Sequence, residues 1–395
     1  MTPLATEYVG EKGALFRLAL KTSVLTVLTL GFYRFWMKTR LRRYYWSAIR
    51  PGGAPLEYTG QPLEKLLGFL VAVVIMAFYI GVVNLILMFV SFSLFQGNIT
   101  AYALSFVGVL PIIFFAQYRA RRYILARTRW RGIRFGLEPG AWGYAWRAAL
   151  YWALAIVSLG LLYPLKAFRL EKYRVDRTHF GSARFEQTGS WKDLYPAMKH
   201  LLWNGVIFAV LMAIGVANGM SSVLFYLIIG LPWGVYGLAY WQAGSFRILA
   251  EGKRLDGLKF QSSPRSGRIF GIWMLGGLLI QLCMTALLVG FLFAIVMALF
   301  GVGVIGGGGS WDLETQLARQ PAWVQILVGI VGYFSIFLTW SVLRQVFFTL
   351  PLIKHFAEET ALLNPEALGA IDQRARDEFA EAEGFADALD VGAAL

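Results

Sequence analysis

The 395-residue chain contains one cysteine and three histidines. Cys283 lies inside an apolar run, so the sequence excludes an intramolecular disulfide framework and a cysteine-based metal site. His179, His200 and His355 are far apart in the sequence and form no cluster with ligand spacing. We therefore expect neither a metal ion nor another cofactor.

Sequence motifs of known enzyme classes are also missing. The chain has no H-E-x-x-H, no G-x-S-x-G, no P-loop and no paired carboxylates. The stretch GVGVIGG at 301–307 matches G-x-G-x-x-G, but a dinucleotide site needs a preceding strand and a following helix. This stretch follows a long apolar run and precedes a polar segment, which indicates a periplasmic turn. Glu57 and Glu186 are expected to pair with neighbouring arginines, so we expect no enzymatic activity.

Charged residues are scarce, at 15% of the chain, whereas 57% of the residues are hydrophobic. Apolar stretches of roughly 20 residues are long enough to cross a bilayer as helices. We therefore predict an all-α polytopic membrane protein with six spanning helices in three hairpins. The spans are expected within 66–95, 99–117, 201–217, 222–241, 269–300 and 322–350.

The formal net charge of +14 would suggest a nucleic-acid partner in a soluble chain. In a membrane protein, however, basic residues mark the cytoplasmic loops, so we expect no nucleic acid. Four segments hold 28 of the 37 Lys and Arg residues, and all four are predicted to be cytoplasmic together with both termini. These segments are 37–65, 118–147, 166–200 and 244–268.

Two shorter apolar segments do not fit this topology. Segments 15–36 and 148–165 have basic residues at both ends, and a full crossing by the second would place eight arginines outside. We predict that both are re-entrant or interfacial elements, bent at the glycine of TLG or SLG. The alternative is eight full spans with a violation of the positive-inside bias.

The chain also shows internal similarity. A shift of 129 residues aligns 30–60 with 159–189 without a gap, with ten of 31 positions identical. A shift of 125 residues aligns 117–139 with 242–264, so we predict a duplicated unit followed by an extra hairpin. The predicted parts are a first repeat at 1–147, a second repeat at 148–268, a third membrane hairpin at 269–351 and an acidic cytoplasmic tail at 352–395.

Each of the four basic loops contains a turn signal. The tetrapeptides are PGGA, WRGI, FGSA and LDGL, and the Asp-Gly pair in the last one favours a type I′ hairpin. The residues that follow each signal suit short strands. We therefore predict a small cytoplasmic cap of four β-hairpins beneath the membrane helices.

The junction TLGFYRFW, the following R-x-R-R-Y and the closing LEYTG resemble the YjgN-like bacterial inner-membrane proteins, also called the domain-of-unknown-function 898 family. The resemblance covers roughly 15–360 and is strongest at 29–60. It implies a multi-pass protein of the bacterial inner membrane. The resemblance transfers no reaction, substrate or catalytic residue.

The arginine-aromatic junctions have two interpretations. They anchor the chain at the headgroup level, or their arginines recognise an anionic headgroup or solute. Polar residues inside the spans form a second candidate site, for which helix packing is the alternative. The candidate anion contacts are Arg40, Arg43, Tyr44, Arg121, Arg122, Arg169, Tyr173 and Arg247, and the candidate intramembrane residues are Asn84, Gln117, Asn204 and Gln242.

Two functions stay open at this point. The first is a transporter, channel or lipid-handling protein whose basic cytoplasmic face binds anionic headgroups or solutes. The alternative is a non-transporting membrane scaffold or envelope-organising protein. The expected partners are anionic lipids of the inner leaflet, with protein partners or a homo-oligomer left open.

Overall fold

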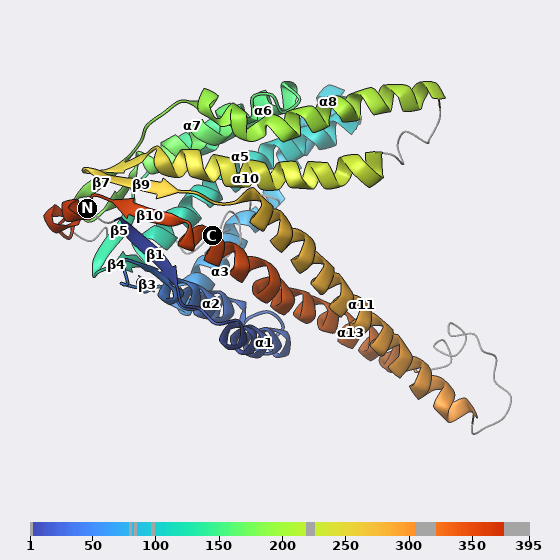
Figure 1. The fold of residues 1–395 in the computed structure, drawn as a ribbon. Coiled ribbons are helices and arrows are strands. Elements are labelled where there is room, and N and C mark those ends of the chain that lie inside the picture. The colour runs from blue at the N-terminus through green and yellow to red at the C-terminus, as the bar shows by residue number, and fades with distance from the viewer. Residues whose placement is uncertain are drawn as a thin grey trace. The chain divides into compact units, whose positions relative to one another are not determined.

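The computed structural model describes residues 3–78, 81–82, 85–95, 99–218, 226–304 and 321–374. The chain divides into two compact units (Figure 1). We call Met1–Val9, Arg42–Phe270 and Lys354–Leu395 the sheet unit, and Gly10–Leu41 with Gly271–Ile353 the helical unit.

The sheet unit is organised around ten short antiparallel strands. Their order in the sheet is β2-β1-β10-β9-β8-β7-β6-β5-β4-β3, so a strand from each end of the chain lies among the hairpins. The strands are β1 (Leu4–Tyr8), β2 (Ile49–Pro51), β3 (Leu56–Tyr58), β4 (Thr128–Trp130), β5 (Ile133–Leu137), β6 (Thr178–Phe180), β7 (Ala183–Gln187), β8 (Lys253–Leu255), β9 (Leu258–Ser262) and β10 (Thr360–Leu363).

Three of the four turn signals close hairpins. In β4–β5 the turn residues Arg131 and Gly132 have φ of 51° and 80°, the left-handed pair of a type I′ turn. Asp256 and Gly257 do the same in β8–β9, and β6 pairs with β7 across Gly181. The PGGA segment differs, because β2 pairs with β1 whereas β3 pairs with β4.

Alternate strand residues form an apolar cluster on one face of the sheet. Trp130, Phe180, Leu255 and Leu258 are buried in it, and Phe135 packs against Phe180 at 4.7 Å between ring centroids. The residues between them in the strands are mainly charged. This alternation is the pattern of a sheet with one apolar face, since successive side chains point to opposite sides.

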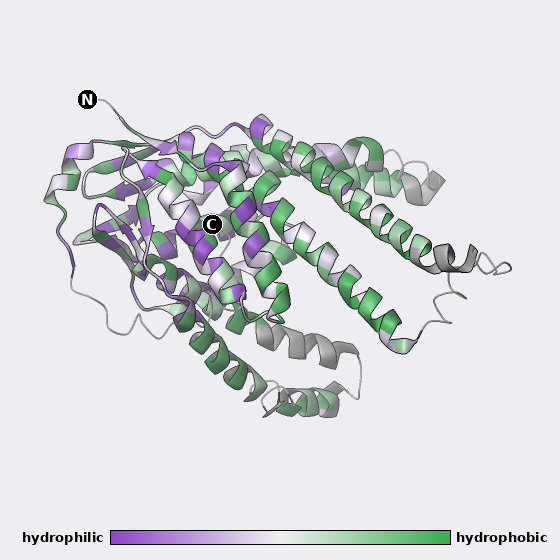
Figure 2. Ribbon diagram, turned by 90° about the horizontal axis from the view of Figure 1, so that it is seen from below, coloured by the Kyte–Doolittle hydropathy of each residue, from purple (hydrophilic) through white to green (hydrophobic). Residues whose placement is uncertain are grey.

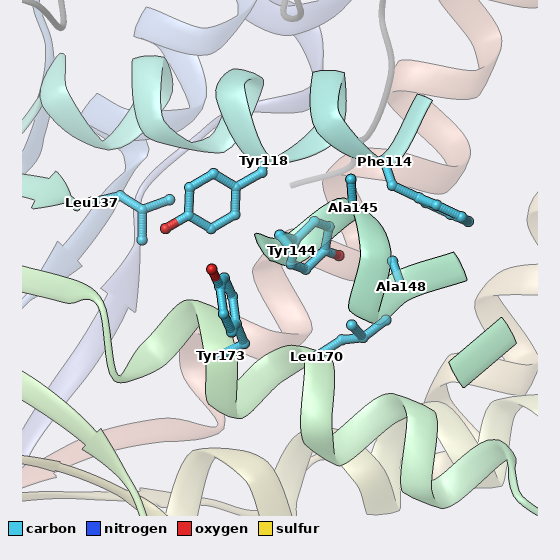
Figure 3. Packing of buried hydrophobic residues seen from close by; sticks show 8 residues of the cluster. All are labelled: Phe114, Tyr118, Leu137, Tyr144, Ala145, Ala148, Leu170 and Tyr173. Carbon is cyan, nitrogen blue, oxygen red and sulfur yellow. The ribbon is translucent and has the colours of Figure 1, made fainter. Parts of the chain in front are cut away.

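Helices of the sheet unit pack around a second core. It joins α5, β5, α6 and α7, and its tyrosines Tyr118, Tyr144 and Tyr173 lie within 6.0 Å of one another between ring centroids (Figure 3). The helices are α3 (Pro62–Phe78), α4 (Leu85–Phe95), α5 (Ile99–Ala126), α6 (Ala141–Val157), α7 (Tyr163–Val175), α8 (Tyr195–Asn218) and α10 (Leu231–Glu251), with the shorter η2 (Trp191–Leu194), η3 (Tyr226–Gly230) and η5 (Pro365–Ala370).

The helical unit is built from α1, α11 and α13, and α1 packs along α13. Hydrophobic residues cover these long helices, whereas hydrophilic residues are frequent among the strands (Figure 2). Three helices continue from one unit into the other. The elements are α1 (Lys12–Leu28), α13 (Ala322–Arg344) and η4 (Gln345–Thr349), and the continuing helices are α2 (Arg34–Ala48), α11 (Ser266–Val304) and α14 (Leu350–Glu358).

The structure corrects the predicted fold class. The chain is not all-α, because the loops predicted to form a small cap contribute to a ten-stranded sheet that also recruits β1 and β10. Among the described residues, three helices rather than six are long and apolar enough to cross a membrane: Trp191–Ile214, Ser266–Met297 and Ala322–Glu358. Within the apolar stretch 66–95, the described residues form α3 and α4, of 17 and 11 residues.

The two glycine junctions have the same backbone. Leu30 and Leu159 have φ of 51° and 50°, and the following Gly31 and Gly160 have φ of 95° and 87°. Each glycine N–H donates to a carbonyl five residues earlier at 2.7 Å, as in the Schellman helix ending. The internal duplication and the entry of these segments into a bilayer both stay predictions.

Some predicted features lie partly or wholly outside the described residues. Asn84, the turn at 96–98 and the segment 305–320 are among them. Residues 301–304, expected in a turn, belong to α11. Residues 352–374, assigned from the sequence to an acidic tail, contain the end of α14, β10 and η5.

A basic pocket in the sheet unit

A cavity of about 490 Å³ lies where α3 begins and α5 ends, next to strands β4 and β5. Five arginines and a histidine face it, against two glutamates. We call it the basic pocket. Its lining residues are Thr59, Gln61, Glu64, Arg122, Ala126, Arg127, Arg129, Arg134, Phe135, Gly136, Leu137, Glu138, Pro139, His179 and Arg374.

The hairpin β4–β5 supplies two of the arginines. Its two-residue turn places Trp130 opposite Ile133, and therefore Arg129 directly opposite Arg134. Like charges directly opposite in an antiparallel pair are unfavourable. On its other side, Arg129 is the register partner of Glu57 on β3.

The last turns of α5 supply two more. Arg122 is buried, and its Nε donates to the Leu137 carbonyl at 3.0 Å, which ties α5 to the end of β5. Arg127 donates to Glu64 from Nε at 3.1 Å and from Nη2 at 3.0 Å. Although burial disfavours its charged form, the hydrogen bonds and charge of Glu64 raise the pKa of Arg127 above its usual value. Arg127 is therefore a permanent cation.

His179 on β6 occupies space that glycine leaves open. A Cβ at Gly136 would lie 2.1 Å from the His179 Nε2, so any larger residue there would displace the imidazole. Gly136 is the register partner of His179 across β5 and β6. The glycine thus allows the ring to lie over the strand at the pocket wall.

The C-terminal segment delivers the last arginine. The Asp372 carbonyl accepts a hydrogen bond from the Ser182 N–H at 2.7 Å, and the Asp372 N–H donates to the Ser182 Oγ at 3.0 Å. Gln373 Oε1 accepts from the Arg134 N–H at 3.0 Å. These contacts fix the segment beside the sheet and place Arg374 at the pocket.

The second glutamate of the pocket, Glu138, has its own partner. Its carboxylate lies 3.3 Å from Arg184, whose side chain is 60% exposed. The Glu138 carbonyl accepts from the Tyr118 hydroxyl at 2.7 Å. The positive charge of the pocket is therefore only partly compensated by its own carboxylates.

The structure brings few of the predicted anion contacts together. Arg122 alone of that set lines the basic pocket. Tyr173 is buried, and its hydroxyl donates to the Gly140 carbonyl at 2.9 Å, a packing role. The others are dispersed: Arg40 lies over the Tyr33 ring, Arg43 donates to the Gly60 carbonyl, Tyr44 packs edge-on against Tyr45, Arg121 approaches Glu171, and Arg169 and Arg247 are exposed.

The predicted intramembrane residues likewise form no shared site in the described structure. Asn204 is buried and donates to the Gly230 carbonyl at 2.7 Å, while its Oδ1 accepts from the Tyr226 hydroxyl at 3.1 Å. These bonds join α8 to η3, as expected for helix packing. Gln117 and Gln242 are half-buried on α5 and α10.

A separate ionic cluster surrounds Glu171 on α7. Arg174 lies 2.7 Å from one carboxylate oxygen, and Lys253 and Arg121 lie 3.1 Å and 3.8 Å from the other. Burial alone would raise the pKa of Glu171, but Lys253, Arg174 and Arg121 hold it well below its usual range. This carboxylate joins α7 to α5 and β8.

Sequence reasoning missed Glu64, Arg127, Arg129, Arg134, His179 and Arg374. A signal for two of them was present, because a two-residue turn at 131–132 fixes Arg129 opposite Arg134. The others depend on the packing of α3, α5 and the C-terminal segment.

Comparison with known proteins places the chain among bacterial proteins. A family model described as a bacterial protein of unknown function, DUF898, matches residues 3–285. The chain belongs to this family. The resemblance drawn from its sequence is confirmed, and the matched range includes every residue of the basic pocket except Arg374.

A curated relative of this DUF898 protein is the inner membrane protein YjgN of Salmonella typhimurium. The two are 28% identical over 162 residues, and the match covers 38% of each chain. No solved structure matches the chain.

Proposed function

We propose that this DUF898 protein is a bacterial inner-membrane protein that binds a phosphate-bearing anion in the basic pocket. The observation that carries the proposal is the convergence of five arginines on one cavity. Guanidinium groups bind phosphate oxygens through paired, charge-assisted hydrogen bonds, which makes arginine the preferred residue for such ligands.

The pairing of Arg129 with Arg134 supports an external anion. Arg129 is the register partner of Arg134 on β5 and of Glu57 on β3, so an anion bound beside the two arginines would reduce the repulsion between their charges.

The size of the cavity supports a ligand larger than a lone phosphate. Pockets for small molecules typically measure about 300–1,000 Å³, and the basic pocket falls in that range. Either a soluble phosphorylated compound or the headgroup of an anionic lipid has this chemistry.

The membrane location is supported by two observations. Three helices of the described chain are long and apolar enough to cross a bilayer. The name of the relative YjgN states that it is an inner membrane protein. Transport and a scaffold role stay predictions, as do the cytoplasmic termini.

The experiment titrates inorganic pyrophosphate into the full-length protein in phosphatidylcholine nanodiscs, by isothermal calorimetry. We expect saturable binding that Arg134→Gln weakens about tenfold, the usual value of a charge-assisted contact. Arg254→Gln is the matched control, because Arg254 also faces a cation, Lys259, across the sheet but lies outside the pocket lining. Absence of binding, or equal losses in both variants, would overturn the proposal.

A second arm distinguishes the source of the phosphate. The titration is repeated in nanodiscs that also contain phosphatidylglycerol. If a headgroup is the ligand, this lipid weakens pyrophosphate binding in wild type and not in Arg134→Gln. Unchanged binding assigns the pocket to a soluble ligand.

A further inference from the structure

Glu64 is one of the two glutamates that line the basic pocket. Three donors converge on its Oε2: the Tyr123 hydroxyl at 2.9 Å, and Nε and Nη2 of Arg127 at 3.1 Å and 3.0 Å. Burial, followed by Tyr58 and Glu64, raises the pKa of Tyr123 far above its usual value, so Tyr123 remains a donor. A carboxylate oxygen here stands where an oxygen of a bound phosphate would be stabilised.

The two partners differ in their access to water. The side chain of Arg127 is 9% exposed, whereas that of Glu64 is 31% exposed. The Glu64 carboxylate is already partly solvated and can turn fully into water without a desolvation penalty. Leaving the buried Arg127 guanidinium without an anion, in contrast, would be costly. An incoming anion that replaces Glu64 on Arg127 removes that cost.

Glu64 also belongs to the first turn of α3. Negative charge at that position is favourable for the helix, and its bond to Arg127 ties the start of α3 to the end of α5. Release of Glu64 would break this connection while leaving α3 intact. Pocket occupancy and the attachment of α3 are thereby linked.

We infer that the ligand binds by displacing Glu64 from Arg127, so that occupancy of the basic pocket releases the N-terminal end of α3. This inference rests on the proposed function and adds Arg127 as a ligand-binding residue and Glu64 as its internal competitor. The pocket is thus a site that exchanges its own carboxylate for an external phosphate.

The first test is the affinity of pyrophosphate for the full-length protein in phosphatidylcholine nanodiscs. Glu64→Gln removes the competing charge and should raise the affinity about tenfold, because one like charge at contact range in a partly solvated site is lost. Tyr123→Phe keeps the charge but removes one of the three hydrogen bonds, and should raise it about twofold. Arg127→Gln should lower the affinity.

The second test is amide hydrogen exchange in the first hydrogen-bonded turn of α3, at residues 66–69. Pyrophosphate should accelerate exchange there in wild type and leave it unchanged in Glu64→Gln, where the connection is already weakened. If Glu64→Gln does not fold, as its melting temperature will show, Tyr123→Phe provides the same comparison with a smaller effect.

The outcomes separate the two proposals. If pyrophosphate fails to bind wild type, the proposed function is wrong. A different result would contradict the displacement of Glu64 alone. In that case pyrophosphate binds wild type and Arg134→Gln weakens the binding, but Glu64→Gln does not bind pyrophosphate more tightly and amide exchange at 66–69 does not change. The anion site would then stand without the displacement.

Discussion

Glu171 and Glu64 each face a cluster of cations in the sheet unit, but the clusters differ in how completely they are closed. Both oxygens of Glu171 are used, by Arg174 on one side and by Lys253 and Arg121 on the other, and its side chain is 11% exposed. Glu64 uses one oxygen, on Tyr123 and Arg127.

The two clusters differ in the number of carboxylates relative to arginines and in how exposed the carboxylates are. At Glu171 the protein supplies the anion at the centre of the cluster, so the cluster joins helices and sheet. In the basic pocket Glu64 binds Arg127 and Glu138 binds the exposed Arg184, while Arg129 lies between Glu57 on β3 and Arg134 on β5. The first arrangement favours stability and the second favours binding.

The largest expected effect is on Glu171. Glu171→Gln leaves Arg121, Arg174 and Lys253 without their shared counter-charge, and breaking a buried ion pair costs about 3–5 kcal/mol. Chemical denaturation of the detergent-solubilised protein should show this loss in the free energy of unfolding. The control is Glu138→Gln, whose partner Arg184 is exposed. A loss below about 1 kcal/mol would mean that the cluster is not a structural tie.

The same carboxylate should make stability dependent on acid. The pKa of Glu171 is depressed in the folded protein, so its contribution is present above its ordinary unfolded pKa and is lost as pH falls toward the folded value. We expect wild type to lose stability relative to Glu171→Gln as the pH decreases below about 4.5, with no such difference in slope near neutrality. Thermal melts of both proteins across acidic pH measure this, and parallel curves throughout would contradict it.

In the basic pocket, loss of an arginine should affect anion binding rather than the free energy of unfolding. Arg134→Gln removes the positive charge opposite Arg129 on β4, so in buffer without multivalent anions the free energy of unfolding should stay within about 0.5 kcal/mol of wild type. Pyrophosphate should then raise the melting temperature of wild type more than that of the variant. A large destabilisation without anion would show that Arg134 serves the fold rather than a ligand.

The smallest expected effect is at the rim of the pocket. Arg184→Ala removes the exposed pair with Glu138 and an exposed hydrogen bond to the Asp176 carbonyl, and exposed ion pairs contribute about 0.2–1 kcal/mol. The melting temperature should hardly change, and added salt should make no further difference. A substantial loss of stability would show that Glu138 belongs to a closed ionic cluster like that of Glu171.

Local features of the fold were predictable from the sequence. Asp256-Gly257 adopts the left-handed turn that its residue types favour, Arg131-Gly132 adopts the same turn with glycine at its second position, and the long apolar run at 269–300 lies in one helix. The junctions at Gly31 and Gly160 also bend where the sequence indicates. These features depend on residues close together in the chain.

The remaining features depend on distant pairings that no local pattern encodes. Leu4 and Leu362 are register partners of β1 and β10, at opposite ends of the chain, and their strands turn separate hairpins into one sheet. Arg374 likewise reaches the pocket because Asp372 bonds to Ser182. Counting apolar stretches predicted six spans, whereas three helices among the described residues are long and apolar enough to cross a membrane.

The most direct test is a crystal structure of the protein soaked with tungstate, a tetrahedral dianion with a strong anomalous signal. The anomalous map should show a peak in the basic pocket within hydrogen-bond distance of Arg127 and Arg134, with Glu64 turned away and no peak at Glu171. An empty pocket, or a peak among Arg121, Arg174 and Lys253 instead, would contradict the assignment of one cluster to binding and the other to stability.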